Sequence, residues 1–433
     1  MRALVASIAA LLVSTAILMT GSGLLGTLLS VRMKVEAYSN GVTGAVMATY
    51  FAGMLLGAAL SATIIRRAGH IRSFGVFAAI ATASALLHGL FVHAPAWAVL
   101  RGFTGFCFAG LYMVIESWLN ERGTGGARGR LFSIYQIVSY AGLGGGQFLL
   151  GLAPVSGPEL FMIDAVILAL CLVPVTLTRA IHPTPPQRHR MAIRAVRRAS
   201  LLGVLICLGA GVINGAGFTL APVFVMAQAG VDSVSTFMGA MILGGVMLQY
   251  PIGHLSDRFD RRLLIAAVNA VLLLVAVVIL LTADKGFVLL ALLGAVYGGL
   301  TFTLYPLAVA HINDRIDTHD FVGVSAAMLF IWGVGAVIGP VGIGRVMDLA
   351  GPSGLFVCVA AVSALLGAAA FLARGESMPA GEKVTPFVAM GRTTPIITEM
   401  DPRAEHIDPQ VDWIEALKQA AESTSTAENE TLA

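Results

Sequence analysis

The chain alternates between long apolar runs and short polar segments. Most of the runs are about 20 residues long, which lets a helix cross the ~30 Å hydrocarbon core of a bilayer. The pattern predicts an all-α integral membrane protein with twelve transmembrane helices. They are expected at residues 4–29, 42–64, 74–92, 97–119, 131–153, 160–178, 201–226, 234–256, 263–282, 287–311, 321–346 and 355–373.

A polar linker divides these predicted helices into two sets of six. A shift of 191 positions places Gly142 and Gly144 on Gly333 and Gly335. The same shift pairs the basic residues at 66–67 with residues 257–258, and a shared offset favours duplication, with chance matching of glycines as the alternative. We predict two pseudo-symmetric six-helix bundles. The domains are residues 1–178, a basic linker at 179–200, residues 201–373, and a largely disordered tail at 374–433.

Basic residues are unevenly shared between the two predicted sides of the membrane. With a cytoplasmic amino terminus, the inner segments before the tail hold 17 Lys and Arg, and the outer segments hold five. Positively charged loops stay on the cytoplasmic side, so both termini are predicted to be cytoplasmic. The net charge of +3 therefore reflects topology and does not indicate a nucleic-acid partner.

The remaining composition disfavours catalysis and cofactor binding. All four cysteines lie in apolar runs, where we interpret them as small packing residues rather than disulfide or metal sites. No G-x-x-x-x-G-K-S/T sequence occurs, which argues against transport driven by ATP within this chain. We predict no enzyme activity, no cofactor and no metal site.

Three motifs resemble signatures of the major facilitator superfamily. The segment GHLSDRFDRR at residues 253–262 is similar to its G-x-L-x-D-R-x-x-R-R loop, and RGFTGFCFAG at 101–110 resembles its fourth-helix signature. GAVIGPVGIG at 335–344 resembles its Gly-Pro helix signature. Residues 115–130 are similar to a branch of poorly characterised bacterial members. The resemblance covers residues 1–373 and implies alternating access in a bacterial inner (plasma) membrane, with a proton as the commonest coupling ion.

The resemblance also implies a gate of charged residues at the inner ends of the helices. In the first half, Arg66 stands where the family has an Asp. We predict that Asp257 of the second half meets Arg128 and Arg130 of the first half. Arg66 and Arg67 of the first half are predicted to meet Asp314, Asp317 and Asp320 of the second half. Solvated loop charges are the alternative. The predicted gate residues are Arg66, Arg67, Arg128, Arg130, Asp257, Arg258, Arg261, Arg262, Asp314, Asp317 and Asp320.

Four ionisable residues inside the predicted spans are candidates for proton coupling, because an intramembrane charge is costly and needs a partner or a role. They are Arg101, Glu116, Asp164 and His311. For Arg101, the alternative is that its side chain snorkels to the outer interface. For Glu116, pairing with the gate arginines is favoured over a role as proton carrier. Ordinary interface placement is the alternative for Asp164 and His311.

Neutral polar and aromatic side chains make up the candidate substrate site. They are Thr20, Tyr50, Tyr112, Gln136, Tyr140, Gln147, Asn214, Gln249, Tyr297, Tyr305 and Trp332. Such groups suit a neutral, zwitterionic or amphipathic small molecule, although helix packing can explain each of them singly. Spans one and seven carry no carboxylate at mid-depth, which disfavours lipophilic cations. The Gly-rich segment 209–222 has a composition that permits local unwinding beside a cavity.

Together these features predict a monomeric secondary active transporter in a lipid bilayer, with a small-molecule substrate and a proton as partners. An uncoupled facilitator is the first alternative. A transporter-shaped sensor or scaffold that signals through its tail is the second, and residues 409–422 of that tail are compatible with a helix.

Overall fold

The computed structural model is all-helical, as the apolar pattern predicted. It describes residues 2–122, 127–177, 191–316, 321–373, 387–388 and 391–394, and no strand occurs among them. Eleven helices within these ranges are long and apolar enough to cross a membrane. The chain is therefore a multi-pass membrane protein, as predicted.

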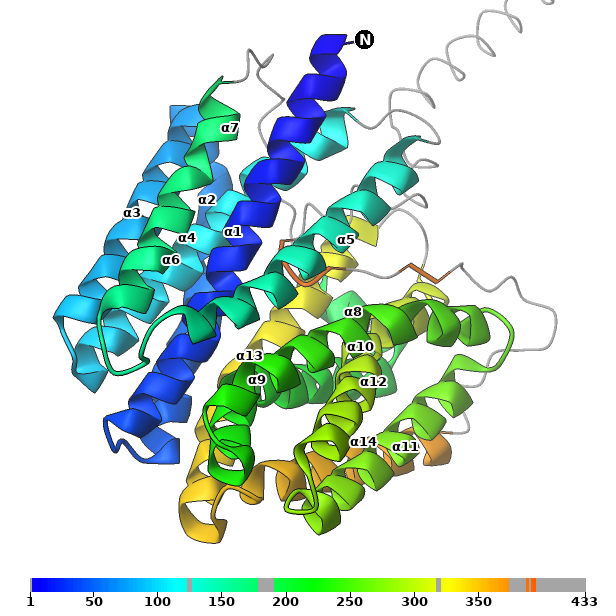
Figure 1. Ribbon diagram of the computed structural model, residues 1–433. Helices are drawn as coiled ribbons and strands as arrows, with labels where there is room; N and C mark the ends of the chain where they lie inside the picture. Colours follow the sequence, from blue (N-terminus) through cyan, green and yellow to red (C-terminus); the bar gives the residue numbers. More distant parts are fainter. Residues whose placement is uncertain are drawn as a thin grey trace, which may run out of the picture.

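The helices of the first half lie together on one side of the molecule (Figure 1). They are α1 (Arg2–Val35), α2 (Asn40–Ala68), α3 (His70–Leu90), α4 (Ala94–Arg122), α5 (Ala127–Phe148), the 3-10 turn η1 (Leu149–Leu152), α6 (Glu159–Leu170) and α7 (Leu172–Leu177). The predicted sixth span is divided at Cys171. Pro174 explains the break, because a proline has no N–H to donate to the carbonyl of Leu170 and its ring clashes with that carbonyl.

The helices of the second half form the other side of the molecule (Figure 1). They are α8 (Ile193–Ala199), α9 (Leu201–Ala229), α10 (Asp232–Ser256), α11 (Arg261–Thr282), α12 (Phe287–Asn313), α13 (Phe321–Ala350) and α14 (Gly354–Leu372). The short α8 shows that the predicted linker is partly helical. Ser200 ends it and begins α9, because its hydroxyl accepts the backbone N–H of Gly203 at 2.8 Å.

Residues 209–222, whose composition permits local unwinding, are continuous helix within α9. Its glycines serve close packing against α13 instead. A Cβ at Gly211 would lie 2.0 Å from the carbonyl oxygen of Trp332, and one at Gly215 would lie 2.5 Å from that of Ala336. Small residues thus let the two backbones approach each other.

The two halves meet along four pairs of helices: α2 with α13, α5 with α10, α1 with α9, and α2 with α9. We call the end with the α2–α3 turn at Gly69 and the α10–α11 loop at residues 257–260 the basic end. Arg66 and Arg67 are exposed there. At the opposite end, α2 and α13 touch through backbone: a Cβ at Gly44 would lie 2.0 Å from the carbonyl oxygen of Pro340. The molecule is therefore closed at the opposite end.

Candidate functional site

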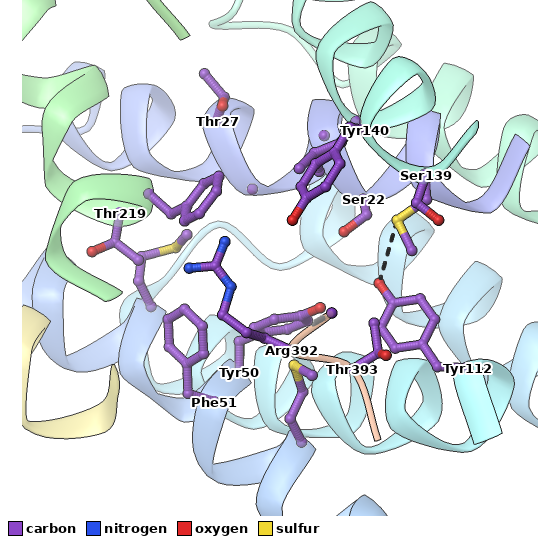
Figure 2. A pocket seen from close by; sticks show the side chains of 18 of the residues that line it. Ser22, Thr27, Tyr50, Phe51, Tyr112, Ser139, Tyr140, Thr219, Arg392 and Thr393 are labelled. Atoms are coloured by element: carbon purple, nitrogen blue, oxygen red, sulfur yellow. Dashed lines mark hydrogen bonds between the residues drawn. The ribbon is translucent and has the colours of Figure 1, made fainter. Parts of the chain in front are cut away.

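A central cavity lies between the two halves (Figure 2). Four helices of the first half, α1, α2, α4 and α5, and two of the second, α9 and α13, supply its walls. Residues 391–393 of the tail also line it, and about 170 Å³ is left free beside them. Six of the predicted substrate residues face this cavity: Tyr50, Tyr112, Gln136, Tyr140, Gln147 and Trp332.

The first-half wall carries a buried cation. Arg101 of α4 is 5% exposed, and its Cζ lies 4.4 Å from the centroid of the Tyr50 ring. A guanidinium over an aromatic face is stabilised by the ring quadrupole. Arg101 therefore points into the cavity and does not snorkel to the interface. Next to it, the Tyr112 hydroxyl lies 3.8 Å from the sulfur of Met19 (Figure 2).

Polar side chains of α1 and α5 close the wall near the opposite end. The Thr27 hydroxyl donates to Oε1 of Gln147 at 2.6 Å. The Gln147 amide in turn donates to the backbone carbonyl of Gly23 at 3.0 Å. The donor and the acceptor of each of these hydrogen bonds lie in the first half, so the bonds hold α1 against α5.

The second-half wall presents one oriented amide. The Asn214 Nδ2 group donates to the backbone carbonyls of Ala210 at 2.7 Å and Thr301 at 3.0 Å. Both donors of the amide are thereby used within the protein. Its Oδ1 atom accepts a hydrogen bond from Nη1 of Arg392 at 2.6 Å. Asn214 was predicted as a substrate residue, and the structure gives its carbonyl group a cationic partner.

Glu116 of α4 is the fully buried acid beside the cavity. The Tyr135 hydroxyl donates to its Oε1 atom at 3.0 Å. The hydroxyls of Thr393 and Thr394 donate to its two carboxylate oxygens. Arg128 and Arg130 were the predicted partners of Glu116. The side chain of Arg128 lies outside the described part of the chain, so the pairing stays a prediction.

A second cavity lies between the central one and the basic end. It encloses about 460 Å³ between α5 and α10 and is also lined by Phe387 and Val388. Gln136 and Tyr140 line both cavities, so the two cavities are adjacent. Gln249, another predicted substrate residue, lies in this second cavity, and its amide donates to the Tyr140 hydroxyl at 3.4 Å.

Besides Asn214 and Gln249, three predicted substrate residues are absent from the lining of the central cavity, because they pack between helices. The Thr20 hydroxyl donates to the carbonyl of Ala16 at 2.8 Å. Tyr297 is 1% exposed and donates to the carbonyl of Ile213 at 3.4 Å. Tyr305 packs its ring against Trp332, with 6.2 Å between centroids. These three side chains therefore take part in helix packing, which was the alternative explanation for each candidate substrate residue.

The other two coupling candidates are also buried. Asp164 of α6 is fully buried, and neither of its carboxylate oxygens has a hydrogen-bond partner among the described residues. His311 of α12 is 1% exposed, and its Nδ1 lies 3.2 Å from Nη1 of Arg315. Asp164 is thus the more unusual of the two, since a buried carboxylate is normally hydrogen-bonded.

The predicted gate residues at the basic end make contacts within their own halves. Arg261 contacts Asp314 at 2.5 Å and Asp257 at 3.3 Å. Arg66 donates to the Thr63 hydroxyl at 3.2 Å. The Arg262 guanidinium donates to the carbonyl of Phe371 at 2.9 Å. Arg67, Arg130 and Arg258 are exposed at the same end. Asp317 and Asp320 lie outside the described residues, and the pairs across the halves stay predictions.

Sequence reasoning missed the tail residues in the cavity. The tail was expected to be largely disordered, yet residues 391–394 lie in the cavity, with the Arg392 side chain at its centre (Figure 2). Phe302, against which Arg392 lies, was also missed. Neither residue carries a sequence signal of its own, because one is a lone arginine in a polar tail and the other a lone phenylalanine in an apolar run.

Apolar helices in two groups around a shared cavity are the architecture of a membrane transporter. A family model described as the Major Facilitator Superfamily matches residues 11–312 and 230–421, and the chain belongs to this superfamily. The chain is 30% identical over 325 residues to the "Uncharacterized MFS-type transporter YcaD" of Salmonella newport (strain SL254). That match covers 74% of this chain and 83% of the relative, and the YcaD protein of Salmonella typhi gives the same values.

Two kinds of solved structure share the fold. The nucleoside transporter NupG has a TM-score of 0.72 at 13% identity, covering 84% of this chain and 98% of its own. A bacterial homolog of the human lysosomal transporter Spinster, in an inward-facing and unoccupied conformation, has a TM-score of 0.66 at 14% identity. It covers 88% of this chain and 99% of its own.

Proposed function

We propose that this chain is a secondary active transporter that moves a small molecule across a bacterial inner membrane by alternating access. One observation carries the proposal. The second cavity lies next to the cavity between the halves and extends to the basic end, whereas helices α2 and α13 meet by backbone contact at the opposite end. A site that is reached from one side and closed on the other suits one of the two states of such a transporter.

The proposal includes a topology. Twelve spans are obtained when α5 and the divided pair α6 and α7 are each counted as one crossing. The basic end is then cytoplasmic, since Arg66, Arg67, Arg130 and Arg258 lie there. Both termini are cytoplasmic in this arrangement, and the six-helix bundles at residues 1–178 and 201–373 move against each other.

We further propose a proton as the coupling ion. Three ionisable groups are buried in or near the cavity of the first half: Arg101, Glu116 and Asp164. Burial of an ion in the membrane is costly, so changes in protonation or partner there bias the equilibrium between two states. Asp164 is our principal candidate for the proton carrier, because its oxygens have no hydrogen-bond partner among the described residues.

A two-stage experiment tests the function. Compounds that raise the melting temperature of the purified chain are first selected from amino acids, nucleosides, sugars, organic acids and drugs. Each is then offered to proteoliposomes with and without a pH gradient. Accumulation against the concentration gradient that collapses with a protonophore supports proton-coupled transport. Equilibration without accumulation identifies a facilitator, and stabilisation without any flux contradicts transport.

A further inference from the structure

The tail places a cation between two aromatic rings of the second half. The Cζ atom of Arg392 lies 4.6 Å from the centroid of Phe302 and 5.5 Å from that of Trp332. Its Nη1 group donates to Oδ1 of Asn214 at 2.6 Å. The guanidinium thus combines two cation–π contacts with one charge-assisted hydrogen bond.

The protein atoms around this guanidinium are prearranged to accept a cation. The Asn214 amide donates to the backbone carbonyls of Ala210 and Thr301, which fixes its oxygen toward the cavity. Trp332 is held by ring contacts with Phe51 and Tyr305, at 6.1 and 6.2 Å between centroids. Neutral acceptors and aromatic faces therefore form a cation subsite that needs no carboxylate in spans one or seven.

Further contacts tie the described tail residues to both halves. Thr393 and Thr394 donate hydrogen bonds to Glu116 of the first half. At the basic end, the backbone N–H of Phe387 donates to Asp257 of the second half at 2.7 Å. The Phe387 ring also packs against Gly253, where a Cβ would lie 2.3 Å from its Cδ1 atom. Residues 387–388 therefore lie in the second cavity near the basic end, and residues 391–393 lie in the central cavity.

The space in the cavity does not admit a second occupant of ordinary size. About 170 Å³ remains beside residues 391–393, whereas small-molecule sites usually hold roughly 300–1,000 Å³. Figure 2 shows the Arg392 side chain crossing the centre of the cavity between Tyr50 and Tyr140. A substrate at this site must displace Arg392.

We propose that residues 391–394 are a built-in occupant of the central cavity, and that the subsite formed by Asn214, Phe302 and Trp332 takes the guanidinium or ammonium group of a cationic substrate that competes with Arg392. This inference rests on the proposed function and specifies its substrate class. The lack of a carboxylate in spans one and seven argued against lipophilic cations, but that reasoning considered only ion pairing. Aromatic rings and an oriented amide oxygen supply the recognition here.

Binding of phenethylguanidinium to the full-length protein in detergent tests the competition. Its neutral counterpart phenethylurea is the ligand control. Arg392→Gln removes the occupant's cation, and Arg72→Gln removes an exposed arginine of α3 as the matched protein control. Release of Arg392 raises the fraction of binding-competent protein, and the apparent dissociation constant falls in proportion. We expect about tenfold tighter phenethylguanidinium binding in R392Q and no change in R72Q.

Three more variants locate the subsite. Asn214→Ala in the R392Q background should abolish the gain in affinity. The double variant Thr393→Val and Thr394→Val should give part of the gain, because it loosens the segment while keeping Arg392. Trp332→Phe should remove the change in tryptophan fluorescence that accompanies phenethylguanidinium binding. Equal affinity in R392Q and the unaltered chain, or equal gains for phenethylurea, overturns the inference.

The binding assay and a flux assay separate this inference from the transport proposal. Binding in detergent needs no membrane and no gradient. Tighter phenethylguanidinium binding in R392Q without flux of any compound overturns transport and supports the occupant. Flux in proteoliposomes combined with unchanged affinity in R392Q supports transport and overturns the occupant.

Discussion

Asp348 of α13 caps the amino terminus of α2 from the other half of the molecule. Its Oδ1 accepts the backbone N–H of Asn40 at 2.6 Å, and its Oδ2 accepts that of Gly41 at 3.0 Å. The first N–H groups of a helix have no partner within the helix, and a carboxylate there also interacts favourably with the helix dipole. This cap is therefore a latch that holds the opposite end closed.

Replacing Asp348 with Ala should open that end. Asp348 is exposed, so water weakens these hydrogen bonds. Loss of a helix cap costs about 0.5–2 kcal/mol, so the closed-to-open equilibrium should shift by about two- to thirtyfold. The readout is a cysteine at Met47, which is 1% exposed and lines the cavity. Its reaction with a membrane-impermeant thiol reagent applied at the opposite end should become faster in D348A.

Asp232→Asn is the control for the latch, because it removes an exposed acid at the same end of the molecule. It should leave the reaction rate of the Met47 cysteine unchanged. An unchanged rate in D348A, or equal increases in both variants, contradicts a latch at Asp348.

Alanine at two glycines of α2 should affect different properties: the closure of the opposite end in one case and the stability of the protein in the other. A Cβ at Gly44 would lie 2.0 Å from the carbonyl oxygen of Pro340 in the other half, and one at Gly53 would lie 2.1 Å from that of Gly102 in the same half. G44A should disfavour the closed opposite end and leave the melting temperature nearly unchanged. G53A should lower the stability by about 1–3 kcal/mol through overpacking.

The matched control is Gly75→Ala, where an added Cβ meets nothing within 4 Å. The melting temperature and the Met47 cysteine reaction should both stay as in the unaltered chain. If G44A and G53A lower stability equally, the interface of α2 and α13 is fixed packing and does not open.

The sequence predicted the fold well because the membrane imposes a length and an apolar composition on each span. Predicted spans at 42–64 and 234–256 correspond to α2 and α10, with differences of a few residues at their ends. The break at Cys171 was missed, since a proline in an apolar run does not by itself mark a break: Pro222, Pro251, Pro306 and Pro340 all lie inside continuous helices. The glycines of α9 are compatible with unwinding or with close packing, and only the structure shows which of the two occurs.

The site was predicted only in part. Tyr50, Gln136 and Trp332 were named because polar and aromatic groups in apolar spans need partners. Tyr297 fits the same description, and only the three-dimensional packing shows that it bonds to another helix. The position of Arg392 depends on the path of the tail, which no local pattern encodes.

Arg261 should matter far more to stability than its neighbour Arg258. Arg261 is 2% exposed and contacts Asp314 at 2.5 Å and the carbonyl of Ala310 at 2.8 Å. Removing one partner of a buried ion pair costs about 3–5 kcal/mol, so R261A should clearly lower the melting temperature. Arg258 is exposed, and R258A should have a small effect. Equal effects of the two changes would contradict a structural role for the Arg261 contacts.

Asp164 should be required for coupling and not for substrate exchange. Asparagine has a similar shape but cannot exchange a proton. Proteoliposomes with D164N should therefore keep substrate counterflow and lose accumulation driven by a pH gradient. Glu159→Gln, at the exposed start of the same helix α6, is the control and should accumulate substrate normally. Full accumulation by D164N would exclude Asp164 as the proton carrier.

Alternating access is the central claim, and distances between spin labels at both ends test it without a known substrate. In a Cys358→Ser background, one pair of labels replaces Lys34 and Leu349 at the opposite end, and another replaces Arg72 and Phe259 at the basic end; all four positions are exposed. Pulsed electron paramagnetic resonance is measured for each pair with Asp348 intact and with D348A. We predict a longer distance at the opposite end together with a shorter one at the basic end. Distances that stay the same, or that lengthen at both ends, would contradict alternating access.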